Sequence, residues 1–84
     1  SCQADQRIAG IKELISLCTQ ETVDALQAIL SLFLEDDDAA VKRAILVGSQ
    51  AQGLRLNMIH LLQLLDDEDD EVRLATLRHL DSLD

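Results

Sequence analysis

The sequence predicts an all-α protein, a short α-α superhelix in which about five antiparallel helices stack as hairpins. Apolar residues recur at spacings of three and four, which is the period of a helix with one buried face. Proline is absent and glycine occurs at only three positions, so the chain lacks the breakers that a strand-and-turn fold needs. In addition, a hairpin pattern at 30–48 recurs at 61–83. Such a repeat indicates stacked units, none of which buries its apolar face alone.

The repeat has an offset of 31 residues, which brings Val41 onto Val72 and Lys42 onto Arg73. At this offset seven residues meet an identical type. They are Leu30, Leu34, Asp36, Asp38, Val41, Ala44 and Leu46, which correspond to Leu61, Leu65, Asp67, Asp69, Val72, Ala75 and Leu77. We therefore expect a single domain over 1–84, made of a terminal helix at 5–18, a first repeat at 20–50 and a second repeat at 54–83.

The first two helices are predicted from their caps and their apolar faces. Asp5 can cap a helix that runs to Cys18, and Thr19 can cap a second helix that ends near Glu35. One side of the first helix carries Ile8, Ile11, Ile15 and Cys18. The second helix is expected to bury Val23, Leu26, Leu30, Phe33 and Leu34.

The other three helices follow from two acidic turns and Gly53. The run 36–38 turns the chain and caps a helix from 39 to about 50, a fourth helix follows Gly53, and the second turn caps a fifth helix over 70–83. The third helix shares one face among Val41, Ala44, Ile45 and Gly48. The fourth is expected to bury Leu54, Met58, Leu61, Leu62 and Leu65, and the fifth Val72, Ala75, Thr76, His79 and Leu83. Short connections make successive helices antiparallel.

The segments DDDAAVKRAIL and DEDDEVRLATLRHL resemble the turn and second helix of HEAT repeats, and the similarity covers residues 22–83. The short period is similar to that of the bacterial repeats found in phycobilisome lyases. One departure is Asn57, which stands where the first copy has apolar Leu26. The resemblance implies a right-handed α-solenoid that acts as a protein-interaction or scaffold module. The alternative is an accessory subunit or lyase-like protein that acts on a cofactor-bearing partner.

The net charge of −9 argues against nucleic acid and against an anionic membrane surface, and it favours a neutral or basic protein partner. Neither acidic turn has the glycine and glutamate spacing of a calcium loop, so we interpret both turns as helix caps. No metal or cofactor is expected. Without an apolar run long enough to span a bilayer, the chain is predicted to be soluble and cytoplasmic. Cys2 leaves a lipidated envelope protein as the alternative, although both cysteines are expected to be free thiols.

The basic residues that follow the two valines have two interpretations. Lys42 and Arg73 occupy equivalent positions and can pair with aspartates in the turns of adjoining repeats. Alternatively, they line the concave face of a HEAT-like array, where partners bind. The predicted partner-binding residues in that case are Lys42, Arg43, Val47, Arg73 and Arg78.

Leu74 and Leu77 fall roughly opposite the Val72 face of the fifth helix, as Leu46 does on the third. They either cover a neighbouring helix of the same chain or form an exposed apolar surface through which molecules can associate. The second case predicts a weak homodimer through the fifth helix or continuation into further repeats.

Catalysis has little support in the sequence. His60 and His79 lie on different predicted helices and point in different directions, and no nucleophile accompanies either one. We therefore expect a structural, partly buried His79, a surface His60 and no enzymatic activity.

Overall fold

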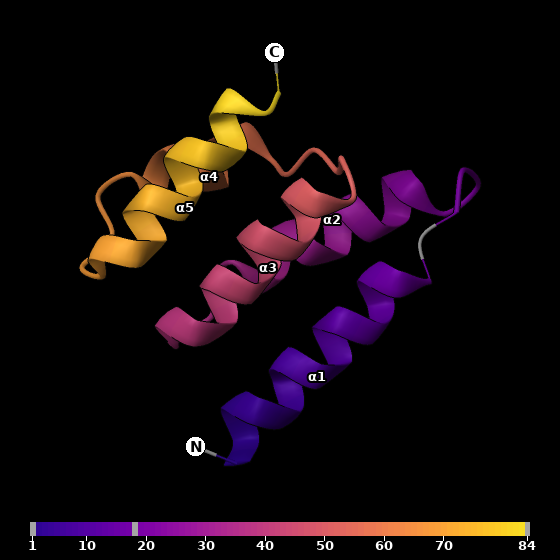
Figure 1. The fold of residues 1–84 in the computed structure, drawn as a ribbon, viewed down its shortest axis with the longest axis horizontal. Coiled ribbons are helices and arrows are strands. Elements are labelled where there is room, and N and C mark those ends of the chain that lie inside the picture. The colour runs from indigo at the N-terminus through magenta and orange to yellow at the C-terminus, as the bar shows by residue number, and fades with distance from the viewer. Residues whose placement is uncertain (1, 18, 84) are drawn as a thin grey trace.

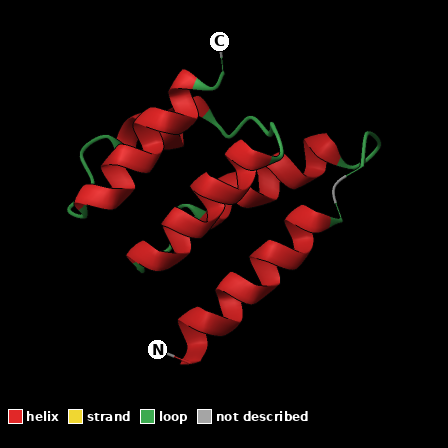
Figure 2. Ribbon diagram, viewed as in Figure 1, coloured by secondary structure: helices red, strands yellow, loops and turns green. Residues whose placement is uncertain are grey.

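A computed structural model describes residues 2–17 and 19–83, which form five helices and no strand (Figures 1 and 2). The helices are α1 (Cys2–Ser16), α2 (Val23–Phe33), α3 (Ala39–Ala51), α4 (Met58–Leu64) and α5 (Asp70–Asp81). The predicted all-α class is therefore confirmed.

The helices lie in two layers (Figure 1). Helices α1, α3 and α5 form the front layer. They run side by side in the same direction, and α3 packs against both of its neighbours. Helices α2 and α4 form the second layer, and the chain reverses direction at each connection (Figure 2). The molecule is consequently flat, with extents of 35 × 35 × 18 Å.

Two pairs of corresponding residues on the inner faces of the hairpins lie in equivalent environments. Leu30 and Leu61 are both inaccessible to solvent, and Val41 and Val72 are 1% and 0% exposed. The core is built almost entirely from aliphatic side chains of all five helices, together with residues between α3 and α4. The 31-residue offset thus relates the inner faces of the two hairpins in packing as well as in sequence.

The N-terminal part differs from expectation in its caps. Helix α1 begins before Asp5, which lies in its first turn, and ends at Ser16. Thr19 does not cap α2. Thr22 holds the N-cap position without a side-chain cap bond, and its hydroxyl accepts the Thr19 N–H at 3.1 Å. Because the two threonines bond to each other within the turn, α2 begins only at Val23. The expectation for Cys18 lies outside the described residues, as does that for the side chain of Cys2.

Helix α4 begins later than predicted, and its buried face changes accordingly. Residue Asn57 is the N-cap, with its side-chain oxygen accepting the Ile59 N–H at 2.8 Å, so the segment before it stays out of the helix. Met58 and Leu62 are 49% and 54% exposed, contrary to expectation, whereas Leu56 and Leu64 are buried.

Phe33, the last residue of α2, was also expected inside but is 41% exposed. Six other residues that were expected inside are only half-buried: Ile8, Val23, Ala44, Gly48, Leu65 and Leu83. Among those expected inside, the buried side chains are Ile11, Ile15, Leu26, Leu30, Leu34, Val41, Ile45, Leu54, Leu61, Val72, Ala75, Thr76 and His79.

Candidate protein-binding surface

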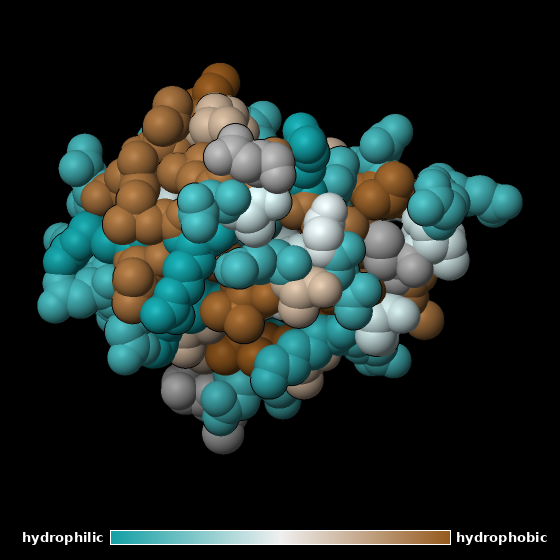
Figure 3. Space-filling model, turned by 45° about the horizontal axis from the view of Figure 1, so that its top comes forward, coloured by the Kyte–Doolittle hydropathy of each residue, from teal (hydrophilic) through white to brown (hydrophobic). Residues whose placement is uncertain are grey.

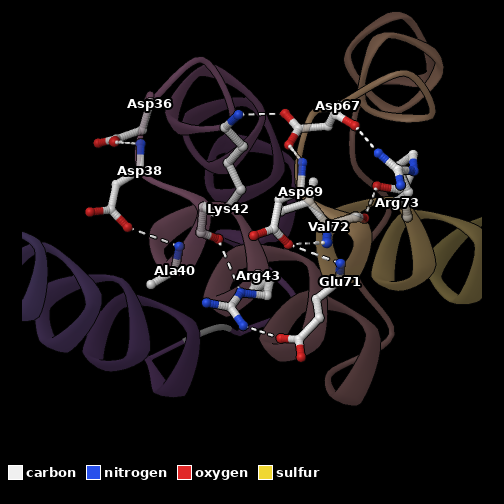
Figure 4. Close-up of polar contacts among 12 residues, drawn as sticks. Asp36, Asp38, Ala40, Lys42, Arg43, Asp67, Asp69, Glu71, Val72 and Arg73 are labelled. Atoms are coloured by element: carbon white, nitrogen blue, oxygen red, sulfur yellow. Dashed lines mark hydrogen bonds and ion pairs between the residues drawn. The ribbon is translucent and has the colours of Figure 1, made fainter.

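The acidic turns first serve the helices that follow them (Figure 4). Asp38 accepts the Ala40 N–H at 2.8 Å, and Asp69 accepts the N–H groups of Glu71 and Val72 at 2.9 and 3.0 Å. These bonds satisfy donors that the helix itself leaves unpaired. The interpretation of both turns as caps is confirmed.

A further aspartate in each turn connects that turn to the preceding helix of the front layer. Asp36 and Asp67 each accept a backbone N–H within the turn, at 2.8 and 3.0 Å. Asp36 also pairs with Arg7 of α1 at 2.8 Å. Asp67 pairs with Lys42 of α3 at 2.5 Å (Figure 4). The predicted pairing of Lys42 with an aspartate of the adjoining repeat is therefore confirmed.

The Lys42–Asp67 pair is well shielded from water. The side chains of Lys42 and Asp67 are only 15% and 12% exposed, against 43% and 20% for Arg7 and Asp36. The hydrogen bond from Lys42 holds the pKa of Asp67 below its ordinary value, although burial opposes this effect. Lys42 is thus committed to holding α3 and the second turn together.

Arg73 corresponds to Lys42 but has no later turn among the described residues to contact. It donates to the Asp67 carbonyl at 2.5 Å and pairs with Asp70, so it folds back on its own turn. Arg43 pairs with Glu71 across the α3–α5 junction (Figure 4). Three of the five predicted binding residues therefore already hold ion pairs within the chain.

One recess on the front layer lies between α1 and α3. It is an open groove of about 410 Å³, and its lining residues are Ile8, Lys12, Ala40, Arg43, Ala44, Val47 and Gly48. Val47 is 59% exposed. The two helices approach closely because Gly48 has no side chain, and a Cβ there would lie 2.8 Å from Ile15 Cδ1.

The groove combines an apolar floor with two cations, Lys12 and Arg43. Of the seven Lys and Arg residues, six belong to α1, α3 and α5. Within residues 2–17 and 19–83, Lys12 and Arg78 make no ion pair. The sequence interpretation missed Lys12 and Ile8 as groove residues because it treated the first helix as an atypical end. The position of Lys12 four residues after Ile8, on the same side of the helix, was the available signal.

The two histidines occupy unlike environments. His79 is inaccessible, and its Nε2 accepts the Leu56 N–H at 3.5 Å. Burial lowers the pKa of His79, and the nearby Leu46 backbone opposes this in part. His60 was expected at the surface, but its side chain is only 19% exposed, because it lies between α2 and α4 with Nε2 3.8 Å from the Glu35 carboxylate. Across the described part of the chain, no three His, Cys, Asp or Glu side chains converge to hold a metal ion.

The buried His79 predicts that the protein loses stability on mild acidification. Its pKa is lowered on folding, so the unfolded chain takes up the proton first and the free energy of unfolding falls as the pH drops below about 6.5. One histidine changes this free energy by at most about 1.4 kcal/mol per pH unit. Urea denaturation at pH 7.5 and 5.5 measures the loss, and Asp67 titrates well below this window.

The control for this prediction is His79→Gln, which retains an acceptor for the Leu56 N–H but does not titrate. Its stability should vary less between the two pH values than that of the wild type. An equal pH dependence in both proteins would assign the effect to another group.

Comparisons with known proteins identify no relative of this chain. No protein-family model matches it, and neither a curated protein nor a solved structure does. None of the helices described is long and apolar enough to cross a bilayer. The HEAT-like assignment therefore stays a prediction that rests on residues 22–83 themselves.

Proposed function

We propose that the protein is a non-enzymatic protein-interaction module, a short HEAT-like α-solenoid that binds a partner on the face formed by α1, α3 and α5. Two features support the solenoid: these helices run in the same direction, and Arg7–Asp36 repeats the arrangement of Lys42–Asp67. The observation that carries the binding function is the groove between α1 and α3, where exposed Val47 stands near Lys12 and Arg43.

The groove favours a segment with one apolar side chain and a neighbouring carboxylate. Ile8, Ala44 and Val47 offer apolar contact, and Lys12 offers an ammonium group without a partner in the described chain. The net charge of −9 attracts a partner that is basic over most of its surface. The carboxylate that meets Lys12 is therefore a local feature of a neutral or basic partner.

Site-specific photo-crosslinking tests this function. A photoreactive residue at position 47 should capture a specific protein from the source cells, and the same residue at position 59 should not. Ile59 is a suitable control because it is 67% exposed but lies on α4, in the other layer.

Once the partner is identified, Val47→Glu should weaken its binding at least about tenfold, the loss expected for a residue at the centre of an interface. Ile59→Glu should leave the affinity unchanged. Capture through position 59 alone, or an equal loss in both variants, would move the binding face to the α2–α4 layer and contradict the proposal. The lyase-like alternative predicts instead a new visible absorbance band on mixing with a bilin.

A further inference from the structure

The α4–α5 end of the molecule exposes an apolar surface that we call the stack-end face, formed by Met58, Leu62, Arg73, Leu74 and Leu77. Its four apolar side chains are 46% to 55% exposed. Figure 3 brings this end toward the viewer and shows hydrophobic side chains gathered over α4 and α5. The face is separate from the groove between α1 and α3, so the two surfaces can be tested independently.

The first hairpin has an equivalent surface, and there the second hairpin covers it. The residues 31 positions before those of the stack-end face are Gln27, Ser31, Lys42, Arg43 and Leu46. Gln27 and Ser31, on α2, accept the backbone N–H groups of Arg55 and Asn57 at 2.7 and 2.8 Å. On the α2 side of this equivalent surface, Gln27 and Ser31 therefore hold the segment that leads into α4.

On the α3 side of the same surface, side chains of the first hairpin contact the second turn and α5. Lys42 pairs with Asp67 at 2.5 Å, and Arg43 pairs with Glu71. Leu46 is inaccessible to solvent, and its backbone lies next to the His79 side chain of α5. All five residues thus serve to dock the following hairpin.

The same device occurs three times along the front layer. A cation is followed four residues later by an aliphatic side chain at Arg7 and Ile11, at Lys42 and Leu46, and at Arg73 and Leu77. In the first two cases the cation pairs with a turn aspartate and the aliphatic residue is 4% and 0% exposed. In the third case Arg73 folds back on its own turn and Leu77 is 55% exposed.

We propose that the stack-end face docks a partner helical hairpin that carries an aspartate in its turn. Arg73 then exchanges its contact with Asp70 for the partner's aspartate, and the apolar face of the hairpin covers Leu62 and Leu77. A second copy of this chain does not fit, because both of its equivalent aspartates, Asp36 and Asp67, are already paired within the chain.

A lengthened chain tests this proposal by supplying such a hairpin at high effective concentration. Residues 54–84 are repeated once after position 84, and Asp84→Gly supplies the glycine that precedes the repeat, as Gly53 does with its φ of 70°. The added copy of Asp67 then falls 31 residues after Asp67. We expect one cooperative transition with a higher urea midpoint than that of the 84-residue chain.

The decisive comparison is Leu77→Glu in both chains. It should lower the urea midpoint of the lengthened chain by roughly 1 M or more and change that of the 84-residue chain by less than about 0.3 M. Replacing the added copy of Asp67 by asparagine should destabilise the lengthened chain when Arg73 is present, and have a smaller effect when Arg73→Met is also introduced. An equal effect of Leu77→Glu in both chains would overturn the proposal.

The oligomeric state of the 84-residue chain provides an independent check. Sedimentation should find a monomer at concentrations where a weak dimer would form. A dimer that Leu77→Glu dissociates would show that a second copy covers the stack-end face, and would overturn the choice of an acidic-turn hairpin as its occupant.

Discussion

Leu46→Ala should destabilise the protein by about 2–5 kcal/mol, whereas Leu77→Ala should cost no more than about 0.5 kcal/mol. The two leucines occupy equivalent positions 31 residues apart, but Leu46 is inaccessible between α3 and α5 and Leu77 is 55% exposed. The difference between the two losses in stability therefore measures the effect of a covering hairpin. For a domain of this size, the Leu46 variant loses a large share of a total of about 5–15 kcal/mol.

Urea denaturation followed by circular dichroism measures both variants of this pair. The helix propensities of leucine and alanine are similar, so the comparison is matched for local effects. If Leu77→Ala costs as much as Leu46→Ala, then Leu77 belongs to the core and the outward orientation of this side of α5 is wrong.

The Lys42–Asp67 pair should have a coupling free energy of about 2 kcal/mol in a double-mutant cycle made with Lys42→Met and Asp67→Asn. Both side chains are largely shielded, so each charge left without the other is poorly hydrated. The losses in stability of the two single variants should consequently add up to more than the loss of the double variant.

The matched control is the Arg7–Asp36 pair, measured with Arg7→Met and Asp36→Asn. It has the same position relative to its turn, but the Arg7 side chain is 43% exposed and Asp36 20%. Its coupling should fall in the range of about 0.2–1 kcal/mol that is typical of pairs near the surface. Equal coupling in the two cycles would show that burial does not set the strength of these pairs.

Several features of the site depended on neighbours that the sequence pattern does not reveal. Two interpretations of Lys42 were open until the second turn was seen to lie beside α3, where Asp67 meets its ammonium group. Lys12 lines the groove because α1 packs against α3 at Gly48. The exposed side of α4 followed from the cap at Asn57, which delays the helix to Met58 and shifts its buried face.

The sequence by itself determined the helical class, the capping role of the two acidic turns and the 31-residue register, because these depend on interactions within one helical turn or on direct repetition. The tertiary structure alone decided which equivalent residues are covered. Leu46 and Leu77 have the same residue type and the same place on their helices, but only Leu46 has a further hairpin packed against it. Burial is a property of the surrounding layers, so identical local patterns give a core residue in one repeat and an exposed residue in the next.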